Sequence, residues 1–437
     1  MTNCTQERFE FPSLKGRKIV SEFTGGDVTS DGGSLLLRAI DQRLQLTEQL
    51  LKIIPDKRNP DYIVHSMESL LKQRIYGIAL GYEDLNDHTT LRYDIGFQTA
   101  VNCDDALASS STLCRLENRS SRQVSVDINK VFVETFIQSF HCEPEELILD
   151  FDPTDDLVYG TQEGRFFHGY YGDYCFLPLY VFCGEHLLIS YLRPSNIDGT
   201  KHAWAILALL VNRFRKEWPN VKIIFRGDSG FCRDKMLSWC DRHQVYYITG
   251  IAKNNRLLEY SKSICEEAKI SYEKTLEKQR LFGDFLYSAN SWKEVRRIIV
   301  KAEHASKGEN PRFVVTNLSS DPQFLYEKIY CARGDMENRI KEQQLDLFAD
   351  RTSCHNWWPN QFRLLLSSCA YILVLGIRRI GLENTELEKA QCGTIRLKLF
   401  KIGAVIIRNT RRIRFLLSSA YPYQSLFFKV SDKLVPG

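Results

Sequence analysis

The chain has 437 residues, of which 43% are hydrophobic and 26% charged, with a formal net charge of +4. This is the composition of an ordinary soluble globular protein, and the length predicts two to four compact domains at roughly 150 residues each. The longest apolar stretch, residues 369–377, is shorter than the roughly 20 residues that cross a bilayer, and residues 1–10 lack an apolar signal core. We therefore expect a cytoplasmic protein without a membrane partner.

The thirteen cysteines are scattered along the chain. Their number is odd and no two form a Cys-x-x-Cys pair, so the ligand spacing of a zinc ribbon or finger is absent. We expect reduced and mostly buried thiols rather than disulfides.

Residues 1–144 have mainly helical patterns. Ser30 or Asp31 can cap a helix that begins near Ser34, and apolar residues recur at helical spacing over 62–80. A further helix is expected over 124–140. No catalytic constellation is visible in this region.

From residue 145 the pattern changes to short apolar runs, which are typical of buried strands. These runs lie at 147–151, 176–183, 187–192, 221–225 and 245–252, with helical patterns at 201–218 and 232–243. Gly184 lies in the short connection between the second and third runs, where a hairpin often needs a positive φ. The order predicts a mixed sheet covered by helices. It is also the order of the ribonuclease-H fold, although periodicity alone does not separate that fold from other α/β sheets.

The alternation of strand and helix stops after residue 253. Strand-like runs at 281–288, 294–302 and 312–318 predict a β-rich insertion, followed by helices over 326–348 and 359–380. Residues 391–437 hold nine basic residues and one acidic residue, Asp432, which gives +8 and leaves −4 for the rest of the chain. A basic segment is the expected footprint of a nucleic-acid binder, and a solvated basic face without a partner is the alternative.

Several carboxylates follow the first predicted strand: Asp150, Asp152, Asp155 and Asp156. In an extended strand, Asp150 and Asp152 face the same side. Carboxylates at the end of a buried strand are costly unless they bind a cation or hydrogen-bond donors. An acidic loop that is simply solvated is the alternative.

Asp228 follows the fourth strand, and the carboxyl ends of strands are where ligand sites gather in α/β sheets. Gly227 and Gly230 flank it and permit a tight backbone path. An Asp at this place can also be a helix N-cap.

Glu337 lies in the helix predicted over 326–348. Tyr330, Arg333, Glu337, Lys341 and Gln344 recur there at steps of three and four, so they share one polar face. A solvated helix with a stabilising ladder of charges is the alternative.

The three carboxylates Asp152, Asp228 and Glu337 have one coherent chemical use. Hard oxygen ligands bind Mg²⁺ or Mn²⁺, and two such ions can activate a water or a DNA 3′-hydroxyl and steady the leaving oxygen. Arg333 suits a phosphate oxygen through its planar fork.

An aromatic run lies between the first two strands, with Phe166, Phe167, His168, Tyr170 and Tyr171. These side chains can stack on the bases of a DNA end. We favour packing in the core or within a loop, because aromatic side chains are mostly buried. Trp357 and Trp358 receive the same interpretation.

The motifs resemble those of insertion-sequence transposases with a DDE catalytic domain, close to the group 1 family. The matching stretches are DFDPTDD, TQEGRFFHGYYGDYCFLPLYVF, LRPSNIDGTKHAW, FRGDSGFCR and YCARGDMENRIKEQQLDLFADRTSCHNWWPNQFR, with GYEDLNDHTTLR and STLCRLENR nearer the N-terminus. The resemblance covers nearly the whole chain. It implies a ribonuclease-H-like α/β catalytic core with a mixed sheet, interrupted by a β-rich insertion, with helical N-terminal and C-terminal regions.

The resemblance also implies residue roles. Asp152, in an Asp-x-Thr context, is the first catalytic acid rather than Asp150, while Asp228 is the second and Glu337 the third. All three are then ligands of Mg²⁺ or Mn²⁺, with two ions expected.

Related transposases carry a Tyr, Arg, Glu, Lys signature around the third acid. Tyr330, Arg333 and Glu337 match it, but Gln344 stands where the Lys is expected. Lys341, about one turn earlier, is our predicted substitute. We expect Tyr330, Arg333 and Lys341 to contact DNA, together with four residues of the basic C-terminus: Arg396, Lys398, Arg411 and Arg412.

These expectations divide the chain into five regions. They are a helical DNA-binding region (1–144), the first part of the core (145–253), the β-rich insertion (254–325), the last part of the core with the third acid (326–380) and a basic C-terminal region (381–437).

The resulting prediction is a cytoplasmic, nucleoid-associated transposase that binds the terminal inverted repeats of an insertion sequence and its target DNA. It pairs two ends as a homodimer on synapsis. A stand-alone metal-dependent DNA nuclease and a catalytically silent, transposase-derived DNA-binding protein are the alternatives. A carboxylate-pair glycosidase is disfavoured by the basic tail and the metal-like triad.

Overall fold

The structure of the protein is a computed structural model that describes residues 8–435. The chain forms two compact units. Unit 1 is drawn from Met1–Ser120, Asp346–Phe348 and Cys369–Gly437, and unit 2 from Ser121–Leu345 and Ala349–Ser368.

Unit 2 is built on a mixed sheet. In the described part of the chain it has nine strands in the order β12-β13-β15-β11-β10-β4-β8-β9, with β14 beside β13. β10 runs parallel to β4 and β11, and the other pairs are antiparallel. The strands are β4 (Glu146–Pro153), β8 (Leu179–Cys183), β9 (His186–Tyr191), β10 (Lys222–Gly227), β11 (Tyr246–Ile251), β12 (Gln279–Tyr287), β13 (Arg296–Ala305), β14 (Gly308–Glu309) and β15 (Arg312–Thr316).

The predicted strands of residues 145–253 are present, and their hairpin is confirmed. β8 and β9 pair directly, and Gly184 in their turn has φ +58°. Residues that carry a Cβ atom rarely adopt that backbone conformation, which explains a glycine at this position.

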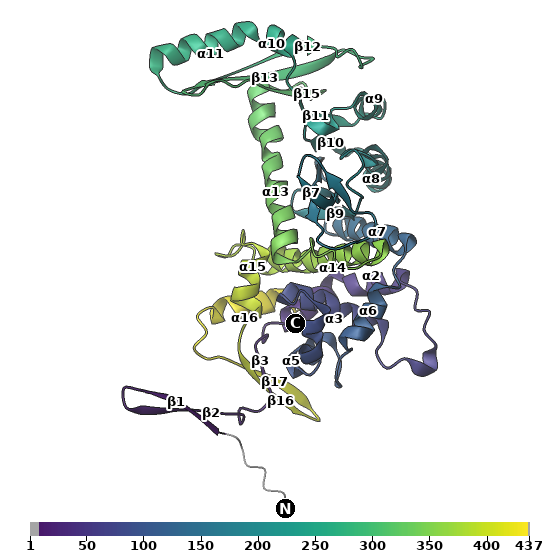
Figure 1. Ribbon diagram of the computed structural model, residues 1–437, viewed down its shortest axis with the longest axis vertical. Helices are drawn as coiled ribbons and strands as arrows, with labels where there is room; N and C mark the ends of the chain where they lie inside the picture. The colour runs from purple at the N-terminus through teal and green to yellow at the C-terminus, as the bar shows by residue number, and fades with distance from the viewer. Residues whose placement is uncertain (1–7, 436–437) are drawn as a thin grey trace, which may run out of the picture. The chain divides into compact units, whose positions relative to one another are not determined.

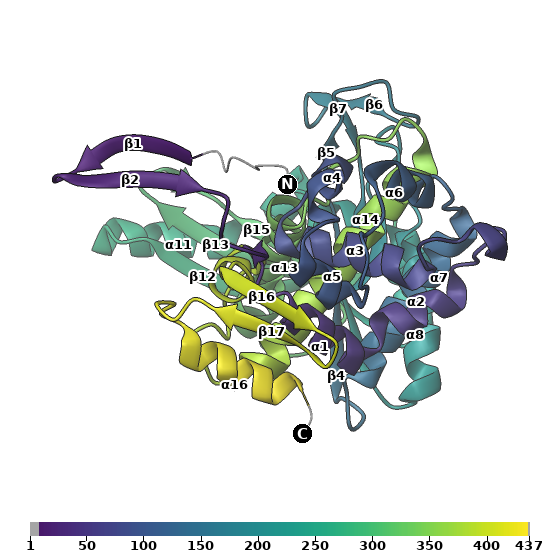
Figure 2. The same cartoon turned by 90° about the horizontal axis from the view of Figure 1, so that it is seen from below.

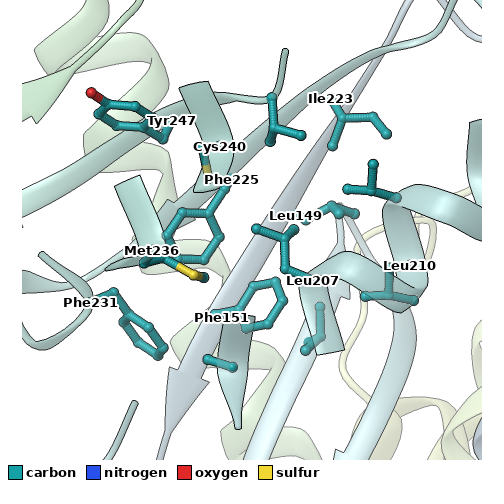
Figure 3. Packing of buried hydrophobic residues seen from close by; sticks show 14 of the residues in the cluster. Leu149, Phe151, Leu207, Leu210, Ile223, Phe225, Phe231, Met236, Cys240 and Tyr247 are labelled. Atoms are coloured by element: carbon teal, nitrogen blue, oxygen red, sulfur yellow. The ribbon is translucent and has the colours of Figure 1, made fainter. Parts of the chain in front are cut away.

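One face of the sheet packs against three helices, α7 (Arg122–Gln138), α8 (Ala203–Glu217) and α9 (Asp234–Arg242). Alternate residues of each strand point to this face, among them Leu149 and Phe151 of β4 and Phe225 of β10. Figure 3 shows these side chains against Leu207 and Leu210 of α8 and Met236 of α9, and all are buried.

The opposite face of the sheet packs against a run of helical turns, which Figure 1 shows beside the strands on the side away from α8 and α9. Ile224 and Ile248 contact Leu325 and Tyr326 of this run. The helix predicted over 326–348 is present as one continuous helical run, in which the type of turn changes along the chain (Figure 1). Its parts are α12 (Pro322–Phe324), η4 (Leu325–Tyr330), η5 (Cys331–Arg333), α13 (Gly334–Lys341) and η6 (Glu342–Asp346).

Residues 254–325, predicted as a β-rich insertion, begin with two helices that the sequence patterns did not indicate. They are α10 (Asn255–Tyr260) and α11 (Lys262–Thr275). The strands that follow, β12, β13 and β15, extend the central sheet through the pairing of β15 with β11.

A second sheet of unit 2 contains β5 (Asp156–Leu157), β6 (Phe166–His168) and β7 (Asp173–Phe176), in the order β5-β7-β6. The interpretation of the aromatic run as core packing is wrong, because Phe166, Phe167 and Tyr170 are exposed. Packing within the segment is present, since Phe167 lies edge-on to Tyr174 and Tyr170 to Tyr171. A sheet this small has too little area to cover both of its faces. Trp357, by contrast, packs edge-on against the buried Phe176.

Unit 1 is mainly helical, as predicted for residues 1–144, but it also holds strands that the sequence did not indicate. Its helices are α1 (Leu35–Leu44), α2 (Leu46–Ile53), η1 (Pro60–Tyr62), α3 (Met67–Leu80), η2 (Leu85–Asp87), α4 (His88–Leu91), α5 (Ile95–Val101), α6 (Ser110–Glu117), η7 (Ile377–Gly381), α15 (Cys392–Ile395), η8 (Arg396–Phe400) and α16 (Gln424–Leu434). Its strands are β1 (Arg8–Leu14), β2 (Arg17–Glu22), β3 (Val28–Thr29), β16 (Ala404–Asn409) and β17 (Arg412–Leu417), and Figure 2 shows the β1–β2 and β16–β17 hairpins.

The long helix α14 (Trp357–Gly376) continues into η7. Residues Trp357–Gly381 are long and apolar enough to cross a membrane by composition, with a mean hydropathy of 1.6. However, 89% of the apolar window is buried inside the protein, which is also the character of a core helix in a soluble protein.

Candidate active site

The first two predicted acids lie side by side at the carboxyl ends of two neighbouring strands in the middle of the sheet. β4 and β10 are parallel neighbours whose register pairs Asp150 with Arg226 and Phe151 with Gly227. Asp152 and Asp228 are the next residues along the two strands. Because neighbouring strands lie about 4.8 Å apart, the two carboxylates occupy adjoining positions at the carboxyl ends.

Asp150, the competing candidate for the first acid, is fully engaged elsewhere. Arg226 forms a bidentate ion pair with it. Nη2 donates to one carboxylate oxygen at 2.6 Å, and Nε donates to the other oxygen. The side chains of this ion pair are 3% and 7% exposed. Asp150 is therefore a structural partner of Arg226, whereas Asp152 lies at the open end of the strand.

Arg226 also joins the sheet to the helical run that carries the third acid. Its Nη1 donates a hydrogen bond to the backbone carbonyl of Ile329. A single buried guanidinium thus contacts β4, β10 and η4, the elements that carry or precede the three predicted acids.

Glu337 reaches the same place from α13 through Arg333. Arg333 Nη1 lies 3.4 Å from Asp152 Oδ1, and Arg333 Nη2 lies 3.1 Å from Glu337 Oε1. The guanidinium of Arg333 therefore lies between the first and third acids and holds them in one cluster.

The electrostatics of the cluster reflect its crowding. Burial, together with the charges of Asp228 and Glu337, raises the pKa of Asp152 to about 7, although Arg333 opposes the shift. Burial lowers the pKa of Arg333, but the surrounding carboxylates outweigh it, so that this pKa is raised. With all carboxylates ionised, three negative charges face one positive charge, and the cluster retains two negative charges.

Two glycines permit the close packing around Asp228. A Cβ on Gly227 would lie 2.8 Å from the ring of Phe231, and a Cβ on Gly250 would lie 2.7 Å from the hydroxyl of Tyr330. Gly230 donates its backbone N–H to Asp228 Oδ1 at 2.8 Å, so Asp228 is also the N-cap of a short turn. The capping interpretation of Asp228 is therefore confirmed, and its role as a catalytic acid stays a prediction.

Tyr330 of the predicted signature lies beside these acids. It is partly buried and packs on Tyr326 with ring centroids 5.7 Å apart. Burial raises the pKa of Tyr330, and the charge of Asp228 adds to the shift while Arg333 opposes it.

Gln344, where the family pattern expects Lys, binds protein rather than solvent. Its Nε2 donates to the carbonyl of Asp155 and to Asp156 Oδ1, both at 2.9 Å. Burial raises the pKa of Asp156 well above its usual range. Gln344 therefore ties the end of the helical run to the loop after Asp152, while Lys341 is exposed.

A divalent cation fits the chemistry of the carboxylate cluster, because carboxylate oxygens are the ligands of Mg²⁺ and Mn²⁺ and the charges of the cluster sum to −2. As they stand, no three acidic, His or Cys side chains within residues 8–435 are placed to hold a metal ion. Arg333 contacts one oxygen of Asp152 and one of Glu337, so a cation shared by these two carboxylates would bind their other oxygens or take the place of Arg333.

The four C-terminal residues predicted to contact DNA fall into two groups. Arg396 is half-buried and donates to the backbone carbonyls of Ala79 and Asp346, and Lys398 lies over the ring of Tyr423 at 4.8 Å. These two cations hold unit 1 together. Arg411 and Arg412 are exposed at the turn of the β16–β17 hairpin.

Sequence reasoning missed the two supporting contacts, Arg226 with Asp150 and Gln344 with Asp156. The signal for the first was present, since Arg226 and Asp150 each stand two residues before a predicted catalytic acid. Charges at equivalent positions of neighbouring parallel strands face each other once the register is known. The second contact had no such signal, because it joins residues 188 positions apart.

The fold and the site together define a class, an α/β protein with a mixed sheet whose parallel strands end in a carboxylate cluster. The chain matches the family model described as transposase DDE domain group 1 over residues 11–436. It belongs to that family of DDE transposases.

The other comparisons add little. The comparison with curated proteins finds no match. Among solved structures, the chain is similar to the piggyBac transposase synaptic complex with hairpin DNA, with a TM-score of 0.42 and 10% identity over 85% of this chain and 80% of that chain. A likeness of this size carries no argument about fold or mechanism.

Proposed function

We propose that this transposase cleaves and joins DNA phosphodiester bonds at the ends of an insertion sequence, with Asp152, Asp228 and Glu337 holding divalent metal ions. The observation that carries the proposal is the convergence of these three acids around Arg333 in a chain of the DDE family. Asp150 is excluded from this set because Arg226 occupies both of its oxygens.

The strand order supports a ribonuclease-H-like core for this chemistry. The strands β9-β8-β4-β10-β11 lie in that spatial order, with three antiparallel leading strands followed by two parallel ones. Asp152 and Asp228 then lie at the carboxyl ends of two central strands, where ligand sites gather in such sheets, and Glu337 comes from α13.

The chain's own residues divide the work. When bound, Mg²⁺ or Mn²⁺ supplies charge stabilisation and an activated water or 3′-hydroxyl. Asp152, Asp228 and Glu337 provide the oxygen ligands. Arg333, once it leaves the carboxylates, presents a planar fork that matches a phosphate of the bound DNA.

The proposed partners are double-stranded DNA, as inverted repeats and as target, and a second copy of the chain during synapsis. The proposed location is the cytoplasm, in association with the nucleoid. A stand-alone nuclease with the same site would cleave without joining, and a silent DNA-binding relative would do neither.

The test is an in vitro reaction of the purified chain with labelled element-end DNA and target DNA, in Mg²⁺ or Mn²⁺. We expect metal-dependent cleavage and joined products, and a loss of at least about 10³-fold in both for Asp228→Asn and Glu337→Gln. Asp335→Asn is the matched control, because Asp335 is exposed on α13 two residues before Glu337. DNA binding in EDTA should be equal for all four proteins.

Each outcome decides between the candidates. Cleavage without joining favours the nuclease. Binding without cleavage in either metal favours the silent relative. Full activity of Asp152→Asn together with an inactive, folded Asp150→Asn would show that the first acid has been misplaced.

A further inference from the structure

The C-terminal β16–β17 hairpin is a short two-stranded ribbon that ends in arginines. Its register pairs Ala404 with Leu417 and continues to Asn409 with Arg412, which leaves a tight turn at Thr410 and Arg411. β3 pairs with the base of β16, and no strand of residues 8–435 pairs with the far end of the ribbon.

The arginines at this end have no counter-charge. Arg411, Arg412 and Arg414 are exposed, and in residues 8–435 no hydrogen bond or ion pair holds their side chains. Arg408 on the neighbouring strand differs, because its Nη1 donates to the carbonyl of Asp104 at 2.9 Å and lies 3.7 Å from the Asp104 carboxylate. From residue 391 to the end of the chain, Asp432 is the one acidic residue.

The turn holds these arginines in a fixed frame. Asn409 Oδ1 accepts hydrogen bonds from the backbone N–H groups of Arg411 and Arg412, both at 3.0 Å. This bond uses the Asn409 side chain inside the turn, as Asx turns do, and leaves both guanidinium groups outside it. A rigid turn lowers the entropy lost when its side chains bind a partner.

One face of the same sheet is apolar and exposed next to the arginines. Antiparallel partners share a face, so Val28, Val405 and Leu416 lie together, followed by Ile407 opposite Arg414 and then by Arg412. The four aliphatic side chains are between 38% and 60% exposed. Isolated exposed aliphatic residues are normal, but a contiguous row that leads to unpaired arginines marks a contact surface.

We propose that the β16–β17 ribbon binds duplex DNA by entering a major groove, with Arg411 at its tip and Arg412 and Arg414 on its leading face. A two-stranded ribbon fits that groove, and guanidinium groups bind phosphates and the guanine edge through paired hydrogen bonds. The positive charge of Arg411, Arg412 and Arg414, which no carboxylate of residues 8–435 pairs, is complementary to a polyanion. The proposal rests on the proposed function for its choice of DNA as the partner.

The experiment measures binding of the full chain to a fluorescent element-end duplex in EDTA, over a range of salt concentrations. Arg411→Ala/Arg412→Ala and Arg414→Ala are compared with Lys429→Ala/Lys433→Ala. The control pair removes the same charge as the first double variant from α16, in the same C-terminal segment. Thermal melting verifies that every variant is folded.

The double arginine variant should bind DNA at least about tenfold more weakly. The slope of a plot of log K against log salt concentration should become shallower by about two, because each lost phosphate contact removes about 0.9 from it. The control pair should bind like the unaltered chain. Arg411→Lys/Arg412→Lys should recover the salt dependence but not the preference for element-end over unrelated DNA.

Equal binding by the arginine and control variants would overturn the ribbon proposal. The proposal would also be overturned if the full chain bound phosphatidylserine vesicles more tightly than duplex DNA and lost that binding in the double arginine variant. Failure of the proposed function is a separate result, namely no metal-dependent cleavage by the unaltered chain in the reaction above. The binding measurement in EDTA does not depend on that reaction.

Discussion

The acidic edge of unit 2 and the basic ribbon of unit 1 each carry charge that the protein itself does not neutralise. At the acidic edge, the carboxylates of Asp152, Asp228 and Glu337 lie around the guanidinium of Arg333. At the ribbon, no carboxylate of residues 8–435 pairs with Arg411, Arg412 or Arg414. Some other buried charges have a partner of opposite sign, as Arg74 has in Glu117 of unit 1 and Arg226 in Asp150 of unit 2. The comparison suggests a division of labour: paired charges stabilise the fold, and the unneutralised charges are where we propose that a metal ion or DNA binds.

The largest expected effect concerns a buried pair of opposite charges, Arg226 with Asp150. Arg226→Ala should lower the free energy of unfolding of the protein by about 3–5 kcal/mol, because it leaves the Asp150 carboxylate buried without its partner. Urea unfolding measures it. The double variant Asp150→Leu/Arg226→Met removes both charges and should recover most of the loss. A double variant as unstable as the single one would show that the pair does more than neutralise itself.

The second prediction concerns the unneutralised charge of the carboxylate cluster, where Arg333 contacts two of the acids. Arg333→Ala should lower the single-turnover cleavage rate about 100-fold while the melting temperature stays within about 2 °C. Arg333→Lys keeps the positive charge but loses the planar guanidinium, so its cleavage rate should lie between those of Arg333→Ala and the unaltered chain. A large drop in melting temperature with unchanged cleavage would place Arg333 with the structural pairs instead.

Glu303 reverses the arrangement of the active site, with one acid among several cations. Burial opposes its charge, but the ammonium groups of Lys278 and Lys301 outweigh burial and lower the pKa of Glu303 to about 2. A lowered folded-state pKa gives stability that is present above the usual value near 4.5 and is lost as the pH falls through about 2.

Glu303→Gln should therefore cost about 2 kcal/mol of stability at pH 7, as expected for charge-assisted hydrogen bonds. The gap in melting temperature to the unaltered chain should narrow as the pH falls below about 4.5. Glu277→Gln is the matched control, because Glu277 is exposed and lies next to Lys278 in the loop before β12. A gap that is independent of pH would mean that the carboxylate charge is not what stabilises β13.

Gln344 gives the smallest expected effect and separates positioning from DNA contact. Gln344→Ala should reduce the cleavage rate about tenfold with unchanged DNA affinity, because the contacts to Asp155 and Asp156 support the loop after Asp152. Gln344→Glu should be worse, since it places a second carboxyl beside the buried Asp156. A loss of affinity at an unchanged rate would show instead that Gln344 touches DNA.

Much of the fold and of the candidate site can be predicted from local sequence. Short apolar runs predict the core strands of residues 145–253, because a buried strand needs apolar side chains on both faces. Carboxylates directly after two such runs predict the acidic edge, since the carboxyl ends of parallel strands meet. The β1–β2 hairpin and helices α10 and α11 were not visible, because little of their surface is buried and their apolar periodicity is weak.

The sequence by itself predicted Asp152, Asp228 and Glu337 as the catalytic acids, and it determined where the positive charge gathers along the chain. Only the tertiary structure decided which charges are surplus. Asp150 and Asp152 look equivalent along the strand, but the register of β4 against β10 gives Arg226 to Asp150. Arg396 and Arg411 look equivalent in a basic tail, yet Arg396 bonds to backbone carbonyls while Arg411 stays exposed. Pairing depends on side chains that meet across long sequence separations, and local patterns do not contain that information.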